Sequence, residues 1–214
     1  LAIDKIISKK IFIKNKILTP KYIRLRLETI SNTKNIYLKI KKKIKFPIVI
    51  KPINEGSSVN VFICNKYNLT KNLKKMTSYD EILIEEFIPG REIQVAVLKN
   101  KVLGTIELRP KRKFYDYEAK YNPKAKTEHI IPVKICSKKL TEVENIAFKA
   151  HKLLKCRGVT RSDFRFFNNK FYLLEINTQP GMTSLSLVPE IARNKGISFS
   201  NLIEEILKDA SINK

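Results

Sequence analysis

Cysteine is scarce in this chain of 214 residues, and long apolar runs are absent. The three cysteines, Cys64, Cys136 and Cys156, lie far apart and lack the paired spacing of a zinc site. A sparse, odd-numbered set is typical of reduced thiols in a cytoplasm, and small buried or half-buried positions are its simplest explanation. Charges interrupt every apolar stretch and no secretory signal is present, so we expect a cytoplasmic protein without a transmembrane helix.

Acidic residues are also few, at 20 against 43 basic ones, which gives a net charge of +23 at pH 7. Such a balance favours anionic partners, namely nucleic acid, phosphate-bearing ligands or a membrane surface. However, Lys is spread over nearly every segment, and Ile and Asn are abundant as well. A coding bias towards these residues explains the charge better than a binding stripe, so the charge favours nucleic acid only modestly.

Hydrophobic residues make up 43% of the chain, which is typical of a globular protein, and no internal repeat or low-complexity linker occurs. Apolar periodicity predicts an α+β protein with mostly antiparallel sheets in two small lobes, residues 1–83 and 84–214. Helices are predicted near residues 4–15, 68–76, 137–156, 187–194 and 199–208. Strands are predicted near residues 22–27, 46–51, 61–63, 81–86, 91–98 and 101–108. Residues 34–44 are ambiguous.

Two carboxylates near the end of the chain belong to a predicted hairpin, in which aromatic-rich runs flank a turn at residues 168–170. With a three-residue turn, Asp163 lies opposite Glu175 and Arg161 lies opposite Asn177, all on one face. A two-residue turn would put the two carboxylates on opposite faces. Clustered carboxylate and amide oxygens suit a hard cation, usually Mg²⁺ shared with phosphates. Taken alone, the same residues are compatible with a solvated polar rim.

Two further motifs are weak individually. Lys51 ends a predicted strand before the loop at residues 55–59, whose free N–H groups could hold phosphate, although the loop is not a Walker A sequence. A turn with a solvated lysine explains it equally well. Farther on, backbone groups of Phe87 and Ile88 could pair with an adenine edge and Glu92 with ribose hydroxyls, but strand-end acids are more often surface charges.

Residues 109–127 form a long polar and aromatic stretch without periodicity. Loops of this length within a domain are usually lids or disordered segments. As a lid over a nucleotide, the segment would bring Lys120 to the terminal phosphate and Tyr121 to a second substrate.

Taken in order, these motifs resemble the D-alanine–D-alanine ligases of the ATP-grasp superfamily. The matching stretches are residues 3–5, 50–52, 55–59, 84–88, 114–121, 161–163, 174–177, 180–183 and 186–189. The most specific is the run Tyr-Asp-Tyr-Glu-Ala-Lys-Tyr with Pro-Gly-Met-Thr downstream. The resemblance implies an ATP-grasp fold, in which two α+β lobes with mostly antiparallel sheets enclose a nucleotide cleft.

The resemblance also implies a role for each matching residue. Binding of ATP is assigned to Lys5, Lys51, Glu85, Glu86, Phe87, Ile88, Glu92, Phe114, Lys120 and Leu174. Binding of two Mg²⁺ or Mn²⁺ ions is assigned to Asp163, Glu175 and Asn177. The catalytic and dipeptide sites are assigned to Ser57, Lys120, Tyr121, Arg161, Gly181, Ser186 and Leu187, with Arg161 and Gly181 stabilising an oxyanion.

The implied activity is ATP-dependent joining of two D-alanine molecules through an acyl phosphate, for peptidoglycan precursors. D-Alanine and ATP are the expected partners, a homodimer is left open, and no nucleic acid or membrane is expected. Another ATP-grasp carboxylate–amine ligase is the nearest alternative. A basic nucleic-acid-binding domain, with aromatic residues of the hairpin as a stacking platform, is the alternative from another class. That alternative explains the charge but would place carboxylates against phosphates.

Two departures from the family pattern stand out. Asn60 occupies the position of a glycine that usually closes the Gly-Ser-Ser-Val-Gly loop, and Asn is the next best residue if φ is positive there. The family also has an N-terminal domain that supplies a carboxylate for the first D-alanine, and this chain starts with Leu1 just after it. We therefore expect the isolated chain to bind Mg-ATP weakly and to form almost no dipeptide.

Overall fold

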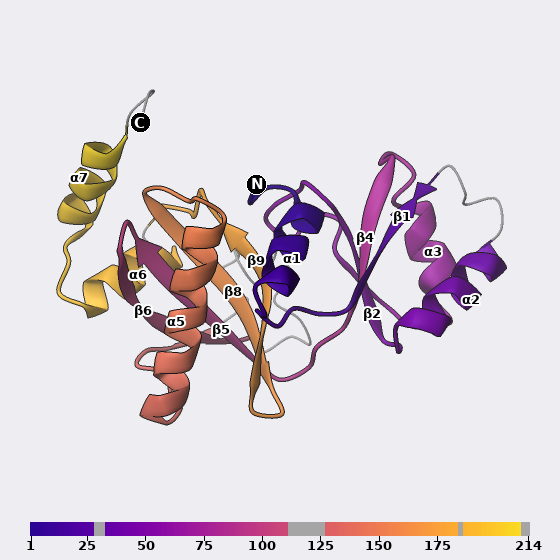
Figure 1. The fold of residues 1–214 in the computed structure, drawn as a ribbon, viewed down its shortest axis with the longest axis horizontal. Coiled ribbons are helices and arrows are strands. Elements are labelled where there is room, and N and C mark those ends of the chain that lie inside the picture. The colour runs from indigo at the N-terminus through magenta and orange to yellow at the C-terminus, as the bar shows by residue number, and fades with distance from the viewer. Residues whose placement is uncertain (28–32, 111–126, 184–185, 211–214) are drawn as a thin grey trace.

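The computed structural model describes residues 1–27, 33–110, 127–183 and 186–210, which form an α+β protein with two antiparallel sheets. The first sheet has the strand order β1-β4-β2-β3. Its strands are β1 (Tyr22–Arg26), β2 (Ile48–Pro52), β3 (Phe62–Cys64) and β4 (Glu81–Glu86). Helices α2 (Thr33–Lys43) and α3 (Leu69–Lys74) cover the outer face of this sheet (Figure 1) and bury its apolar side chains.

The second sheet has the order β7-β6-β5-β8-β9 and helices on both faces. Its strands are β5 (Arg91–Leu98), β6 (Lys101–Arg109), β7 (Glu128–Ile130), β8 (Val159–Phe167) and β9 (Lys170–Asn177). Alternation along β5 separates two cores. Ile93 and Val95 pack towards α5 (Ser137–Leu153), whereas Ala96 packs towards α6 (Leu187–Asn194) and α7 (Phe199–Asp209).

Helix α1 (Lys5–Lys14) lies between the two sheets (Figure 1). Asp4 caps its N-terminus by accepting hydrogen bonds from two backbone N–H groups. Ile6 packs on Leu83 of the first sheet, while Phe12 belongs to the core beneath the second. The helix therefore joins the two lobes.

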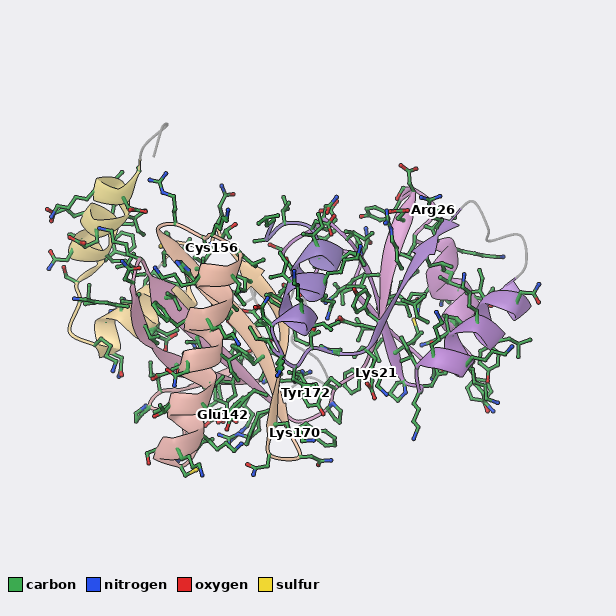
Figure 2. All side chains as sticks on the ribbon, in the orientation of Figure 1. Lys21, Arg26, Glu142, Cys156, Lys170 and Tyr172 are labelled. Atoms are coloured by element: carbon green, nitrogen blue, oxygen red, sulfur yellow. The ribbon has the colours of Figure 1, made fainter. Side chains whose placement is uncertain are left out.

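The β8–β9 hairpin corrects the predicted turn. The loop has two residues, Asn168 and Asn169, both with positive φ, as in a type I′ turn. The pairing of Asp163 with Glu175 is nevertheless confirmed, because the register shifts on the opposing strand at Leu174. This extra residue is a β-bulge. It places Glu175 on the same face as Asp163, whereas a two-residue turn without a bulge would place it on the opposite face. The turn, next to Lys170, lies at the far tip of the hairpin (Figure 2).

Most predicted elements are confirmed within one to three residues, and the ambiguous segment is helix α2. The predicted lobe division between residues 83 and 84 falls within β4, whose pairing with the first sheet continues to Glu86, and it stays a prediction. Within the described residues, no helix is long and apolar enough to cross a membrane.

Candidate active site

A cleft of about 740 Å³ lies between the two sheets. Both lobes line it, with Lys51 from β2, Glu85 from β4, Glu92 from β5, Asp163 from β8 and Glu175 from β9. Its lining combines apolar side chains with a few charged groups, which is typical of small-molecule and cofactor sites. The geometry therefore brings together side chains that are far apart in the sequence and that the motif analysis had selected separately.

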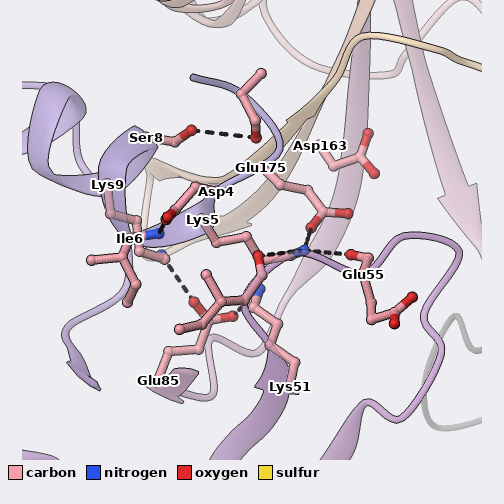
Figure 3. A network of polar contacts seen from close by, with 12 residues as sticks. Asp4, Lys5, Ile6, Ser8, Lys9, Lys51, Glu55, Glu85, Asp163 and Glu175 are labelled. Atoms are coloured by element: carbon pink, nitrogen blue, oxygen red, sulfur yellow. Dashed lines mark hydrogen bonds and ion pairs between the residues drawn. The ribbon is translucent and has the colours of Figure 1, made fainter. Parts of the chain in front are cut away.

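A buried group of charges forms the base of the cleft (Figure 3). The Lys51 Nζ atom lies 2.6 Å from Glu85 Oε1, and the Lys9 Nζ atom lies 2.9 Å from Glu85 Oε2. Lys9 also donates a hydrogen bond of 2.6 Å to Thr19 Oγ1. One carboxylate thus faces two ammonium groups away from bulk water.

The pKa values of these groups follow from burial and from their neighbours. Burial by itself would raise the pKa of Glu85, but Lys51 and Lys9 lie so close that its pKa is lowered overall. Burial lowers the pKa of Lys9 to about 8, against the opposing effect of Glu85. Burial acts in the same direction on Lys51, but Glu85 and Glu175 outweigh it and raise its pKa. Glu85 and Lys51 are therefore charged at neutral pH.

Lys5 lies at the edge of the same group, at the start of α1. Its Nζ donates to the Glu55 carbonyl oxygen at 2.5 Å and lies 3.7 Å from Glu175 Oε2. Burial lowers the pKa of Lys5, with Glu175 opposing the shift. Lys5 and Lys51 are thus both directed at the cleft, where two ammonium groups suit a polyphosphate.

The predicted metal ligands lie on one face of the β8–β9 hairpin, because Asp163 pairs with Glu175 and Arg161 pairs with Asn177. Each of the three ligand side chains already meets a positive or donor group. Arg161 binds both oxygens of Asp163 at 2.8 and 3.0 Å, Lys5 faces Glu175, and Asn177 Oδ1 accepts a bond from the backbone N–H of residue 179.

This donor set fits a hard cation, because all three side chains offer oxygen and attract positive charge. In the described part of the chain, no group of three or more His, Cys, Asp and Glu side chains could hold a metal. A cation at this position would therefore need the amide of Asn177 as its third donor.

The cleft is also lined by residues that the motif analysis assigned to the nucleotide. Glu86, Phe87, Ile88 and Leu174 line it, all of them predicted to hold the nucleotide. The bulge at Leu174 explains how this side chain and its neighbour Glu175 reach the same cleft. Glu92 lies 3.5 Å from Arg165 Nη1, a cation that the sequence analysis missed.

A second hollow, of about 1460 Å³, adjoins the first at Lys5 and Glu175. The predicted dipeptide residues that line it are Ser57, Arg161, Gly181, Ser186 and Leu187. Ser57 and Asn60 have positive φ values of 52° each, as expected for the loop that departs from the family glycine. The three predicted residues Phe114, Lys120 and Tyr121 lie outside the described residues.

Comparison with known proteins decides the family. A sequence model described as the D-ala D-ala ligase C-terminus matches residues 11–208. The D-alanine–D-alanine ligase of Pelagibacter ubique is 68% identical over 214 residues, which cover 100% of this chain and 70% of that protein. The ligase of Wolbachia pipientis wMel is 46% identical over 98% of this chain and 66% of its own length. This chain belongs to the D-alanine–D-alanine ligase family.

Solved structures agree with this family assignment. The Bacillus anthracis D-alanine–D-alanine ligase superposes with a TM-score of 0.82 at 34% identity, covering 97% of this chain and 67% of that one. VanG D-Ala:D-Ser ligase from Enterococcus faecalis gives a TM-score of 0.83 at 26% identity, covering 97% of this chain and 61% of its own. The chain thus spans about two thirds of the length of these family members, and the predicted fold is confirmed.

Lys9 is the residue of this ligase-family chain that sequence analysis missed most clearly. A signal was present, because Lys5, Lys9 and Phe12 follow one another at helical spacing on α1 and all three are buried. A lysine in a buried helical stripe needs an anionic partner, and Glu85 supplies it.

Proposed function

We propose that this chain carries the nucleotide and metal machinery of a ligase that joins two D-alanine molecules at the expense of ATP, for peptidoglycan precursors. The observation that carries the proposal is the arrangement of opposite charges across one cleft. Lys5 and Lys51 come from α1 and the first sheet, and the oxygen donors Asp163 and Glu175 come from the second sheet, with Asn177 in the adjoining hollow. A polyphosphate with its Mg²⁺ ions matches both sides.

The proposed chemistry has two steps. A carboxylate oxygen of the first D-alanine attacks the γ-phosphorus of ATP, and the bond from that phosphorus to ADP breaks. The amine of the second D-alanine then attacks the acyl carbon, phosphate leaves with its oxygen, and the amine loses a proton. Both steps concentrate negative charge, which the protein must offset without reorganising.

The residues of this chain take the following parts in the proposal. Lys5 and Lys51 bind ATP phosphates, Lys120 binds the γ-phosphate, and Arg161 with the backbone N–H of Gly181 binds the oxyanion of the second step. Mg²⁺ or Mn²⁺ held by Asp163, Glu175 and Asn177 would supply charge neutralisation at the transferring phosphoryl group.

The Arg161–Asp163 ion pair has a part in this scheme. Arg161 neutralises Asp163 through two hydrogen bonds. These bonds hold the guanidinium group of Arg161 beside the adjoining hollow, which it also lines. This position suits the proposed role of Arg161 at the oxyanion.

The assay uses the full-length protein with Mg²⁺, ATP and D-alanine, and follows ADP release and dipeptide formation together. We expect ADP and D-alanyl-D-alanine in equal amounts, with neither formed when D-alanine or Mg²⁺ is omitted. D-Serine and D-lactate are offered as second substrates, because the VanG structure is that of a D-Ala:D-Ser ligase. Light scattering on the same sample tests for a homodimer. ADP release without any dipeptide or mixed product would refute the proposal.

A further inference from the structure

One lysine of α1 has no exposed surface at all. Lys9 is 0% exposed, and its ammonium group contacts Thr19, the Glu85 carboxylate and the ring face of Tyr22 at 5.7 Å. Moving a lysine from water into such a place costs free energy unless an anion compensates. The anion here is Glu85, whose carboxylate has a second cationic partner.

The second partner is Lys51, and the carboxylate is divided between the two lysines (Figure 3). Glu85 Oε1 faces Lys51, whereas Oε2 faces Lys9 and, among the described residues, accepts no hydrogen bond of good geometry. Two ammonium groups thus share one buried carboxylate, while Glu175 and Asp163 act on Lys51 from the second sheet. Because Glu85 is shared, it neutralises Lys51 only in part, which favours an anion at the nearest accessible surface.

The accessible surface is the cleft, which Lys51 and Glu85 line and Lys9 does not. Lys9 therefore acts on a ligand only through its neighbours. We propose that Lys9 is a positioning residue for the nucleotide: by sharing the Glu85 carboxylate, it leaves Lys51 incompletely neutralised and directed at the phosphates. The inference rests on the proposed function, because the anion it assigns is the phosphate chain of ATP.

The alternative is that Lys9 only fills space and stabilises the junction between α1 and the first sheet. The two cases differ in their dependence on ligand charge. Without Lys9, the pair of Lys51 and Glu85 is neutral, so affinity for phosphates falls while affinity for an uncharged nucleoside is unchanged. A loss of structure at the cleft would weaken both ligands alike.

The test compares ADP with adenosine on the full-length protein by titration calorimetry. We expect Lys9→Met to weaken ADP about tenfold to a hundredfold and to leave adenosine within about twofold. Lys10→Met is the matched control, because Lys10 is the next residue on the same helix and is exposed. It should leave both affinities within about twofold.

Charge rescue supplies a second readout. In the double variant Lys9→Met/Glu85→Gln, Lys51 keeps its charge without a neutralising carboxylate, so the ratio of ADP affinity to adenosine affinity should recover by at least about threefold relative to Lys9→Met. Thr19→Val removes only the hydrogen bond to Lys9, and it replaces Lys9→Met as the test variant if Lys9→Met does not fold. We expect it to weaken ADP about twofold to fivefold and to spare adenosine.

Circular dichroism establishes folding of each variant before titration. Equal weakening of ADP and adenosine, or no recovery in the double variant, would overturn the role of Lys9 while leaving the proposed function in place. A folded wild-type protein that binds no ADP would overturn both.

Discussion

Gly90 connects the two lobes at the cleft, and replacing it with alanine should destabilise the protein strongly. Its φ of +99° is a conformation that side-chain-bearing residues rarely adopt. A Cβ atom there would lie 2.3 Å from the carbonyl oxygen of Phe166 and 3.2 Å from the Cβ of Phe167. The oxygen belongs to β8, which pairs with β5 beginning at Arg91, so it cannot move without disturbing the ladder.

The magnitude has two parts. The unfavourable φ costs about 1–2 kcal/mol, and displacing a paired carbonyl costs about 1–1.5 kcal/mol for the weakened hydrogen bond. Gly90→Ala should therefore lower the free energy of unfolding by about 3 kcal/mol. Gly196→Ala separates the two parts, because Gly196 also has a positive φ, +77°, but a Cβ there meets nothing within 4 Å. In this control, the free energy of unfolding should fall by only about 1–2 kcal/mol.

Urea unfolding of the wild type and both variants measures the difference. We also expect Gly90→Ala to weaken ADP binding, because Phe87 and Ile88, which line the cleft, lie only three and two residues before Gly90. If Gly90→Ala lowers the free energy of unfolding no more than Gly196→Ala does, then the backbone of β8 at Phe166 shifts easily to accept the Cβ atom. The account of this connection as rigid would then be wrong.

Two further predictions concern the charges of the cleft. Asp163→Asn and Glu175→Gln should each lower Mg²⁺-dependent ADP release about tenfold to a hundredfold or more while keeping the far-UV circular dichroism spectrum, because strand pairing does not need the charge. Near-wild-type turnover at saturating Mg²⁺ would contradict the metal assignment, and Glu204→Gln on the exposed side of α7 is the control. The second is a pH dependence: burial, with Lys51, lowers the pKa of Lys9 to about 8. The protonated form supplies the charge that favours phosphate, so ADP affinity should fall as pH rises through about 8, and Lys9→Met should lack this fall in the same titrations.

The local sequence determined most of the elements and the composition of the hairpin site. Alternating apolar residues predicted the strands, and helical spacing predicted α1, α5, α6 and α7, because these patterns follow from backbone geometry alone. The pairing of Asp163 with Glu175 was predicted correctly from a wrong turn length. Asn168 and Asn169 are enough for a type I′ turn, and the bulge at Leu174 restores the register. Bulges depend on packing across the sheet, so no local sequence pattern in the hairpin predicted this one.

Only the tertiary structure decided how the charged residues at the base of the cleft come together. The sequence identified Lys51 and Glu85 as separate candidates for ATP, but their ion pair depends on the antiparallel pairing of β2 with β4. Lys9 joined them because α1 packs between the sheets, a placement determined by Ile6 on one side and Phe12 on the other. Charge interactions inside a protein depend on distance and burial, and neither is encoded in the spacing of residues along the chain.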